Sequence, residues 1–364
     1  MCKNNYTVFF KMLVVLLAIT FQSDKVMAQV LLLAITFQSD KVMAQVFVRD
    51  NGQKQFKHTV PAGNYSGITP LGGTFYALAD DKAPWDGFRI VEIMLDSISG
   101  AIQTVQDIKQ VATANANRDA EGIVYLPHTK KLMVVGEADN RVVEYDLDGN
   151  ITARELELPS GVGNGSYESL AYDTCRQILW TCTEEPFAND VPLSYSNSEN
   201  AFPGALLRLQ AYDRFLKFIG QWPYVTDAPT ADKSVARNYA SGVSELLVCS
   251  DSTLLVLERE CFVPHSKIGA WVKNNIYKVK LSQMYRGDHS VVQEISSLDA
   301  PVEKELLYSW KTSLTLLKRS FANYEGMCLG PKLVDGSQVL LLVSDSQNQA
   351  HGVLRDWFRS IIIR

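Results

Sequence analysis

Short runs of hydrophobic residues, most of them five to eight residues long, follow one another from about residue 47 to the C-terminus. Some runs alternate with polar residues and others are apolar throughout, and Gly, Asn, Asp and Pro separate them. Both patterns are typical of β-strands, and no stretch shows the periodicity of a long amphipathic helix. The pattern therefore predicts an all-β protein.

One arrangement recurs five times: a small or acidic residue, a short apolar strand, a turn, and a second apolar strand that ends in an acidic residue. The copies begin at Ser66, Asp119, Tyr167, Val243 and Asn323. Further strands are expected behind each hairpin, and the clearest candidates for a third strand are residues 89–95, 141–147, 205–212 and 275–281. Repeated four-stranded units around an axis describe a β-propeller, in which neighbouring blades bury each other's faces.

The number of blades follows less directly from the spacing of the repeats. Five units are visible, and a sixth, degenerate one fits between Ser282 and Phe321, so the sequence predicts five or six blades. Residues 47–60 and 353–363 are expected to complete one blade between them and so to close the ring.

The first 44 residues have the character of a signal peptide. Lys3 and Lys11 precede an apolar run at 12–21, and small residues follow at a cleavage-like site. Residues 16–30 recur without change at 32–46, which places a second cleavage site after Ala44. We expect an exported protein, periplasmic or extracellular, with one domain over 45–364 and no stable membrane span after cleavage; a two-pass membrane anchor is the rival interpretation.

Charge and cysteine content narrow the range of partners. Removing residues 1–44 takes four basic and two acidic residues from the 35 and 40 of the whole chain, which leaves a net charge of −7. Such a surface gives no bias toward nucleic acid and suits cations. Of the five remaining cysteines, Cys175 and Cys182 flank one predicted hairpin and are candidates for a disulfide, with burial as small apolar side chains as the alternative.

Acidic residues recur at matching places in the repeats. Near the start of the first strand, which lines the channel of a propeller, stand Glu121, Glu168, Glu245 and Glu325, with Ser66 in the fifth copy. The second strands end in a further acidic set, expected near the opposite end of the hairpins or on the loops beyond them: Asp80, Glu137, Glu184, Glu258 and Asp345. Equivalent positions around an axis converge, so the first set predicts a crowded ring of carboxylates.

Crowded carboxylates raise each other's pKa unless a positive charge lies among them. Calcium, a hard cation that takes six to eight oxygen ligands, is the simplest candidate, with Asp119 as an additional ligand. Three interpretations stay open: glutamates that bind the backbone of neighbouring blades, a structural calcium site, and a catalytic metal site. If the site is catalytic, Glu121 and Glu325 are the expected catalytic carboxylates of the channel, and Arg118 is the best-placed cation to bind a phosphate substrate. Lys82, Arg141 and Arg259 are weaker choices, expected at the solvated surface.

Five segments in order resemble the phytase-like family, also called the esterase-like family of phytases. They are YSGITPL with FYALADD (65–81), DAEGIVYLP with VVGEADNRVVEYDLDGN (119–150), SYESLAYD with LWTCTEE (166–185), SGVSELLVCSDSTLLVLERE with NNIYKVKL (241–281), and NYEGMCLGPKLVDGSQVLLLVSDSQN (323–348). The resemblance implies an exported bacterial β-propeller that hydrolyses phosphate esters or related small esters.

The function expected from these observations is a calcium-dependent hydrolase of small phosphoesters or esters. The alternative is a non-catalytic propeller that binds a ligand or a protein partner through loops at the channel mouth. Two long polar stretches, 185–203 and 223–240, offer the material for such loops.

Overall fold

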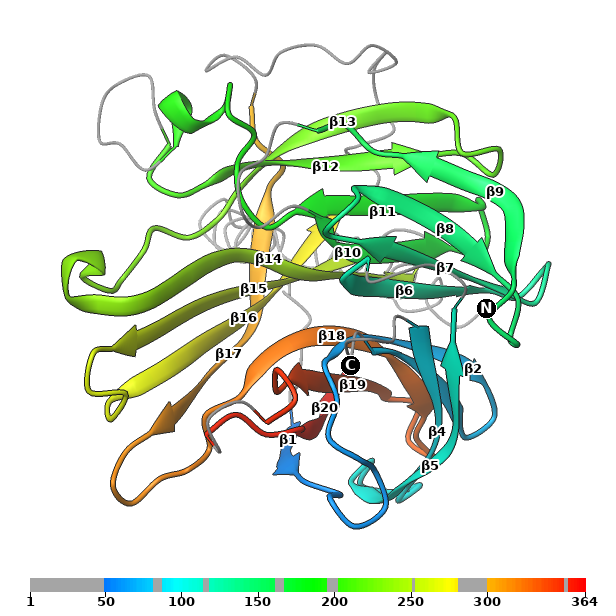
Figure 1. Ribbon diagram of the computed structural model, residues 1–364, viewed down its shortest axis with the longest axis horizontal. Coiled ribbons are helices and arrows are strands. Elements are labelled where there is room, and N and C mark those ends of the chain that lie inside the picture. Colours follow the sequence, from blue (N-terminus) through cyan, green and yellow to red (C-terminus); the bar gives the residue numbers. More distant parts are fainter. Residues whose placement is uncertain are drawn as a thin grey trace, which may run out of the picture. The chain divides into compact units, whose positions relative to one another are not determined.

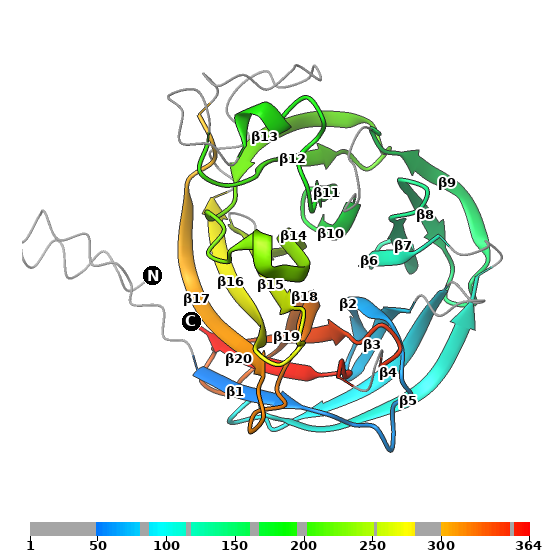
Figure 2. The same ribbon diagram turned by 60° about the vertical axis from the view of Figure 1, so that its left-hand side comes forward.

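The computed structural model describes residues 49–80, 87–113, 118–160, 167–194, 202–250, 253–280, 300–349 and 353–364. Residues 47–364 form one compact unit. The described residues contain twenty strands and two short 3-10 helices, η1 (Val191–Leu193) and η2 (Lys233–Val235). The strands form five antiparallel sheets of four strands each, arranged around one axis (Figures 1 and 2). The protein is therefore a five-bladed β-propeller, and the predicted all-β fold is confirmed.

Each of the first four blades is a continuous meander that runs from the inner strand outward. The first blade contains β2 (Tyr65–Gly72), β3 (Phe75–Asp80), β4 (Gly87–Leu95) and β5 (Ile102–Ala112). The second contains β6 (Ala120–Leu126), β7 (Lys131–Gly136), β8 (Arg141–Tyr145) and β9 (Ile151–Glu157). The third contains β10 (Tyr167–Asp173), β11 (Ile178–Thr183), β12 (Leu206–Tyr212) and β13 (Phe218–Val225). The fourth contains β14 (Ala236–Ser250), β15 (Thr253–Pro264), β16 (Ala270–Lys280) and β17 (Lys304–Leu314).

The fifth blade joins the two ends of the domain. Its inner strands are β18 (Asn323–Lys332), β19 (Gln338–Asp345) and β20 (Phe358–Ile363), and its outer strand is β1 (Arg49–Lys54). β1 pairs antiparallel with β20, so the predicted closure of the ring by the two ends is confirmed. β17 is the outer strand of the fourth blade and not part of a sixth, which settles the choice between five and six blades.

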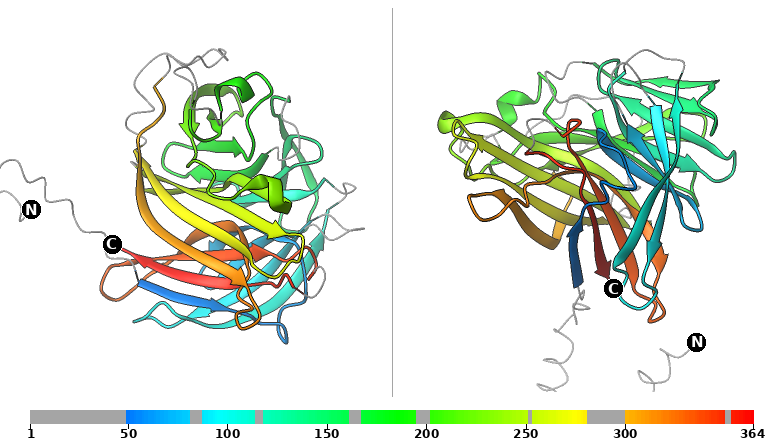
Figure 3. Two further views of the ribbon diagram at one scale, coloured as in Figure 1. Left: turned by 90° about the vertical axis from the view of Figure 1, so that its left-hand side faces the viewer. Right: turned by 60° about the horizontal axis from the view of Figure 1, so that its bottom comes forward.

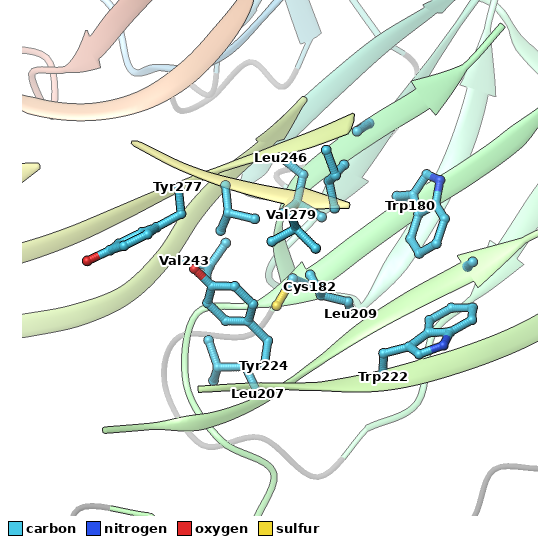
Figure 4. Packing of buried hydrophobic residues seen from close by; sticks show 14 of the residues in the cluster. Trp180, Cys182, Leu207, Leu209, Trp222, Tyr224, Val243, Leu246, Tyr277 and Val279 are labelled. Atoms are coloured by element: carbon cyan, nitrogen blue, oxygen red, sulfur yellow. The ribbon is translucent and has the colours of Figure 1, made fainter. Parts of the chain in front are cut away.

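Packing between neighbouring blades forms the core. Every residue of β11 and β12 is buried, because each of these strands has another blade or another strand on every side. Figure 4 shows the cluster between the third and fourth blades, which extends from Trp180 and Trp222, whose rings lie 5.3 Å apart, to Tyr277 at its other side. Apolar burial of this kind contributes about 25 cal/mol per Å² and is what holds the ring closed.

Two further expectations concern cysteines and membranes. All five described cysteines are free thiols, so the suggested Cys175–Cys182 disulfide does not form: Cys175 is exposed in the β10–β11 turn, whereas Cys182 is buried within the blade.

In the described part of the chain no helix is both long enough and apolar enough to cross a bilayer. The predicted signal peptide lies outside the described residues.

Candidate functional site

A local irregularity in the first strand of each blade, near the strand's start in four blades and in the middle of the longer β14, decides which side chains reach the channel. In β10, Tyr167 pairs with Thr183 but Ser169 pairs with Cys182, so Glu168 has no partner of its own. The same shift occurs in the other inner strands. The residues at this unpaired position are Ser66, Glu121, Glu168, Ser244 and Glu325. Glu121, Glu168 and Glu325 are equivalent, as predicted, but Glu245 is not, because Ser244 takes that position in the fourth blade.

The acids that end the second strands lie at the same end of the channel. Gly136 and Thr183 pair with the first residues of β6 and β10, and Glu137 and Glu184 follow them directly. Asp345 pairs with Asn323, the first residue of β18. The expectation that these acids lie at the opposite end is wrong, because an antiparallel hairpin brings the end of its second strand back beside the start of its first. Six carboxylates from three blades therefore meet at one end of the channel.

The fourth blade supplies a cation at the position where three other blades carry an acid. Val243 pairs with Glu258, which aligns Arg259 with Glu137, Glu184 and Asp345. The Arg259 guanidinium is buried and donates to Glu184 at 2.7 and 2.9 Å, to Glu168 at 3.2 Å, and also to Glu325. The expectation that Arg259 serves as a solvated surface cation is wrong; it neutralises part of the acidic cluster from within.

The remaining part of the cluster is an acidic triad formed by Asp119, Glu121 and Glu137. One carboxylate oxygen from each lies within 4.8 Å of the others, and all three side chains are half-buried. Burial, followed by the charges of Glu325 and Asp119, holds the pKa of Glu121 well above its ordinary range, while a hydrogen bond with Ser66 acts against this. Asp119 also adopts a left-handed backbone (φ 57°), a conformation that Asp tolerates better than most residues.

The acidic triad fits a hard divalent cation. It offers several oxygens at short range, and its like charges are the kind that a bound cation stabilises. The triad includes two of the predicted metal ligands, Asp119 and Glu121, and adds Glu137. Glu168 and Glu325 lie in the same cluster but contact Arg259. The structure thus separates the predicted ring into an arginine-bound part and a part that suits a metal ion.

The acidic cluster predicts that the metal-free protein becomes less stable as the pH rises. Burial and neighbouring charges raise the pKa of Glu121, Glu168, Glu325 and Asp345. A carboxyl with a raised folded-state pKa binds its proton more tightly in the folded than in the unfolded chain. Its contribution is therefore complete below about pH 4.3, the ordinary pKa of glutamate, and is lost as pH rises above it.

We expect the melting temperature, measured in a chelator, to fall as pH is raised from mildly acidic to neutral, apart from any general acid denaturation at lower pH. Calcium should oppose this fall, and its stabilising effect should grow with pH because it binds the deprotonated acids. If calcium left the melting temperature unchanged between mildly acidic and neutral pH, the assignment of the acidic cluster as a calcium site would be contradicted.

Glu245 binds the backbone of the ring instead of joining the acidic cluster. Its Oε1 accepts from the amides of Leu170, on the neighbouring blade, at 3.2 Å and of Leu246 at 2.9 Å. The amide of Met327, on β18, also stabilises its anionic form, but burial dominates and raises the pKa of Glu245 well above its ordinary range. Glu245 thus connects three inner strands, which is the inter-blade role considered for the glutamates as an alternative to metal binding.

This role predicts a contrast between two substitutions. Glu245→Gln keeps the accepting oxygen and resembles the protonated acid, so stability should change little. Glu245→Ala leaves buried amides without an acceptor and should cost about 1–3 kcal/mol of stability. Thermal melts of the two variants test this, and an equal loss in both would show instead that the charge of Glu245 matters.

Arg118 lies apart from the carboxylates that it was expected to assist. Its Nε and Nη2 donate to Asp139 at 2.7 and 3.0 Å, and its Nη1 donates to the Tyr145 hydroxyl at 3.2 Å. These contacts place its guanidinium within the second blade. Arg141 forms an ion pair with Glu155 on the outer strand β9, and Lys82 lies outside the described residues. Arg259, which was among the weaker choices, is the cation whose contacts with the acidic cluster the structure shows.

The opposite end of the channel has a different character. A cavity of about 270 Å³ is lined there by the later residues of all five inner strands, among them Ile68, Val124, Ala171, Leu247 and Cys328. The channel therefore has one acidic end and one largely apolar end. The cluster of carboxylates with Arg259 lies at the acidic end, whereas Asp173 is the charged residue among those that line the cavity at the other end.

Comparison with known proteins places the chain in a family. The family model described as "Phytase-like: Esterase-like activity of phytase" matches residues 60–347, more than half of the chain. No protein of curated function matches the sequence.

Solved structures with similar folds are distant in sequence. A streptogramin B lyase is 12% identical, with 89% of this chain and 100% of that chain covered and a TM-score of 0.34. A member of the DUF4221 family from Bacteroides vulgatus is 8% identical, with 88% and 99% covered and a TM-score of 0.36. A GH43 β-xylosidase/α-arabinofuranosidase from a compost microbial metagenome is 10% identical, with 87% and 94% covered and a TM-score of 0.40.

Proposed function

Because this chain belongs to the phytase-like family, we propose that it is a calcium-dependent hydrolase of phosphate esters or related small esters. The observation that carries the proposal is the acidic triad, whose carboxylate oxygens lie within 4.8 Å of one another. Arg259 contacts the three neighbouring carboxylates, Glu168, Glu184 and Glu325, and a cation held by the triad would bind the same acidic cluster beside this ion-paired group.

Asp119, Glu121 and Glu137 would hold the ion. Calcium is favoured among divalent cations because it accepts oxygen ligands in loose geometry, as three carboxylates from a loop and two strand ends provide. When bound, such an ion polarises a phosphoryl or carbonyl oxygen and makes water a better nucleophile. The triad's own contribution is to fix the position of the reacting group at the channel mouth.

Asp345 is suited to move the proton. Burial and the charge of Glu325 raise the pKa of its carboxyl well above the ordinary range, the direction that favours a carboxyl as a general base. The amide of Gln347 donates to its Oδ1 at 2.7 Å and fixes the side chain. Asp345 also contributes to the raised pKa of Glu121, so it acts on the same group of charges as the triad. We assign it the role of general base, assisted by Glu325.

The test is a hydrolysis assay with p-nitrophenyl phosphate and p-nitrophenyl acetate, in calcium and in a chelator. We expect calcium-dependent turnover of at least one substrate, lost in Glu137→Gln and strongly reduced in Asp345→Asn. Calcium binding without turnover of either class of ester would favour the non-catalytic alternative. In that alternative the described part of the 185–203 segment, held by the Arg208–Asp190 ion pair at 2.7 Å, becomes the place to seek a partner.

Export from the cell belongs to the same proposal. Calcium at the concentrations that loose oxygen sites require is more available outside the cytosol than within it. The prediction itself rests on residues 1–44, and N-terminal sequencing of the protein secreted by its host would test it.

A further inference from the structure

The fourth blade extends beyond the other blades at one end. Its four strands have 15, 12, 11 and 11 residues, and their far ends project together on the left of Figure 1 and of the right-hand view in Figure 3. Ala236 pairs with Pro264, and Ala270 pairs with Leu314, which brings the start of β14, both ends of the β15–β16 turn and the end of β17 side by side. We call residues 232–237, 264–273 and 311–319 the blade-four tip.

Large apolar side chains are exposed at the blade-four tip. Leu316 and Leu317 are 80% and 96% exposed, and Ile268 and Val235, on the adjoining segments, are 51% and 53% exposed. The turn that carries the leucines is ordered: the amide of Thr315 donates to the Lys318 carbonyl at 2.7 Å, and Leu314 bridges to Arg319. A closed turn with two leucines at its apex presents apolar surface that no other described part of the domain covers.

The charge of the blade-four tip is opposite to that of the protein. The tip contains one acidic residue, Asp232, and seven basic residues: Lys233, Arg237, Lys267, Lys273, Lys311, Lys318 and Arg319. Its net charge is thus +6 with histidine neutral, and +5 when Glu260, the cross-strand partner of Lys273, is counted with it, whereas the whole chain carries −5. Such a local reversal attracts an anionic surface while the rest of the molecule is repelled by it.

A hollow beside the turn combines the same two properties. It has a volume of about 170 Å³, and Arg237 and Lys267 line it together with Val263, Leu314 and Phe321. On the neighbouring strands the ammonium of Lys311 lies 3.7 Å from the centre of the Trp271 ring, which stacks on Phe262. Cations above apolar and aromatic side chains match the boundary between lipid headgroups and acyl chains.

From these features we propose that the blade-four tip binds the surface of an anionic lipid bilayer. The exposed leucines enter the boundary between headgroups and chains, and the basic residues contact the phosphates around them. A hairpin turn that projects apolar side chains outward fits a deformable surface better than the concave pocket that a protein would have to provide. The proposal concerns peripheral binding and is independent of the hydrolase activity.

Co-sedimentation with lipid vesicles tests the proposal. The full protein should sediment with vesicles of phosphatidylcholine that contain phosphatidylglycerol as the minor component, and poorly with phosphatidylcholine alone. Leu316→Ser/Leu317→Ser should weaken binding about tenfold or more, because two large apolar side chains are lost from the contact. Lys318→Glu/Arg319→Glu should have a comparable effect, and added salt should weaken binding by the wild type.

Phe215→Ser is the matched control. Phe215 is 73% exposed and lies between Arg214 and Lys217 in a turn of the third blade, so it has similar chemistry at a different place. It should leave vesicle binding unchanged, and all variants should melt as the wild type does. Absence of binding to the anionic vesicles, or an equal loss in Phe215→Ser, would overturn the proposal; binding by the leucine variant at wild-type strength would do so as well.

Discussion

Replacing Arg259 by glutamine should destabilise the protein by about 3–5 kcal/mol, the usual cost of removing one partner from a buried ion pair. The side chain is 6% exposed and contacts three carboxylates that are themselves buried, so its loss leaves Glu168, Glu184 and Glu325 without a counter-charge. For a domain of this size we expect the melting temperature to drop by roughly 4–7 °C, as a thermal melt in chelator can show.

Calcium should restore part of this loss. Without Arg259 the whole cluster is acidic, and a cation that binds only the folded state stabilises it by mass action. Arg141→Gln is the control, because Arg141 and Glu155 form an exposed pair, which typically contributes at most about 1 kcal/mol. A variant Arg259→Gln that melts with the wild type would show that the arginine does not balance the cluster.

The second large effect is expected from Glu121→Gln in the acidic triad. Calcium-dependent hydrolysis should fall by about a hundredfold or more, since removing a ligand is at least as costly as disturbing its outer partners. The same substitution should raise the melting temperature of the metal-free protein, because it removes a charge whose pKa burial and like charges raise. Paired assays of turnover and melting therefore measure two opposite changes in one variant.

A fall in calcium-dependent hydrolysis together with a rise in the melting temperature of the metal-free protein distinguishes a metal ligand from a structural residue. Glu245→Ala, which should lower the melting temperature, provides the contrasting case. If Glu121→Gln lowered both activity and the melting temperature in chelator, Glu121 would be a structural residue of the ring, and the acidic triad would lose its assigned role.

Much of the fold could be predicted from the sequence because a propeller repeats one hairpin. The alternation of apolar strands and turns marks each copy, and the expected third strands correspond to β4, β8, β12 and β16. The joining of the two ends in one blade could also be predicted, since the last unit lacked an outer strand. The number of blades could not be predicted. Residues 282–321 contain the long β17, and their sequence fits either the outer strand of the fourth blade or a separate sixth blade.

The site could be predicted only to the level of an acidic ring. The fourth blade has the same pairing pattern as the others, but Ser244 and not Glu245 occupies the position of Glu168 and Glu325. The same pairing brings Arg259 into line with Glu137, Glu184 and Asp345. The available signal was the sequence LERE, in which the residue after the acidic strand end is basic, but choosing between the two alignments of the repeats required the paired strands themselves.

The measurement that tests the central claim most directly is a calcium titration by calorimetry on the chelator-treated protein. The claim is that the acidic end of the channel is divided between Arg259 and a metal ion held by Asp119, Glu121 and Glu137. It predicts one calcium per chain, with binding lost in Glu121→Gln and retained in Glu168→Gln, whose carboxylate contacts Arg259. No binding by the wild type, or equal loss in both variants, would contradict the claim.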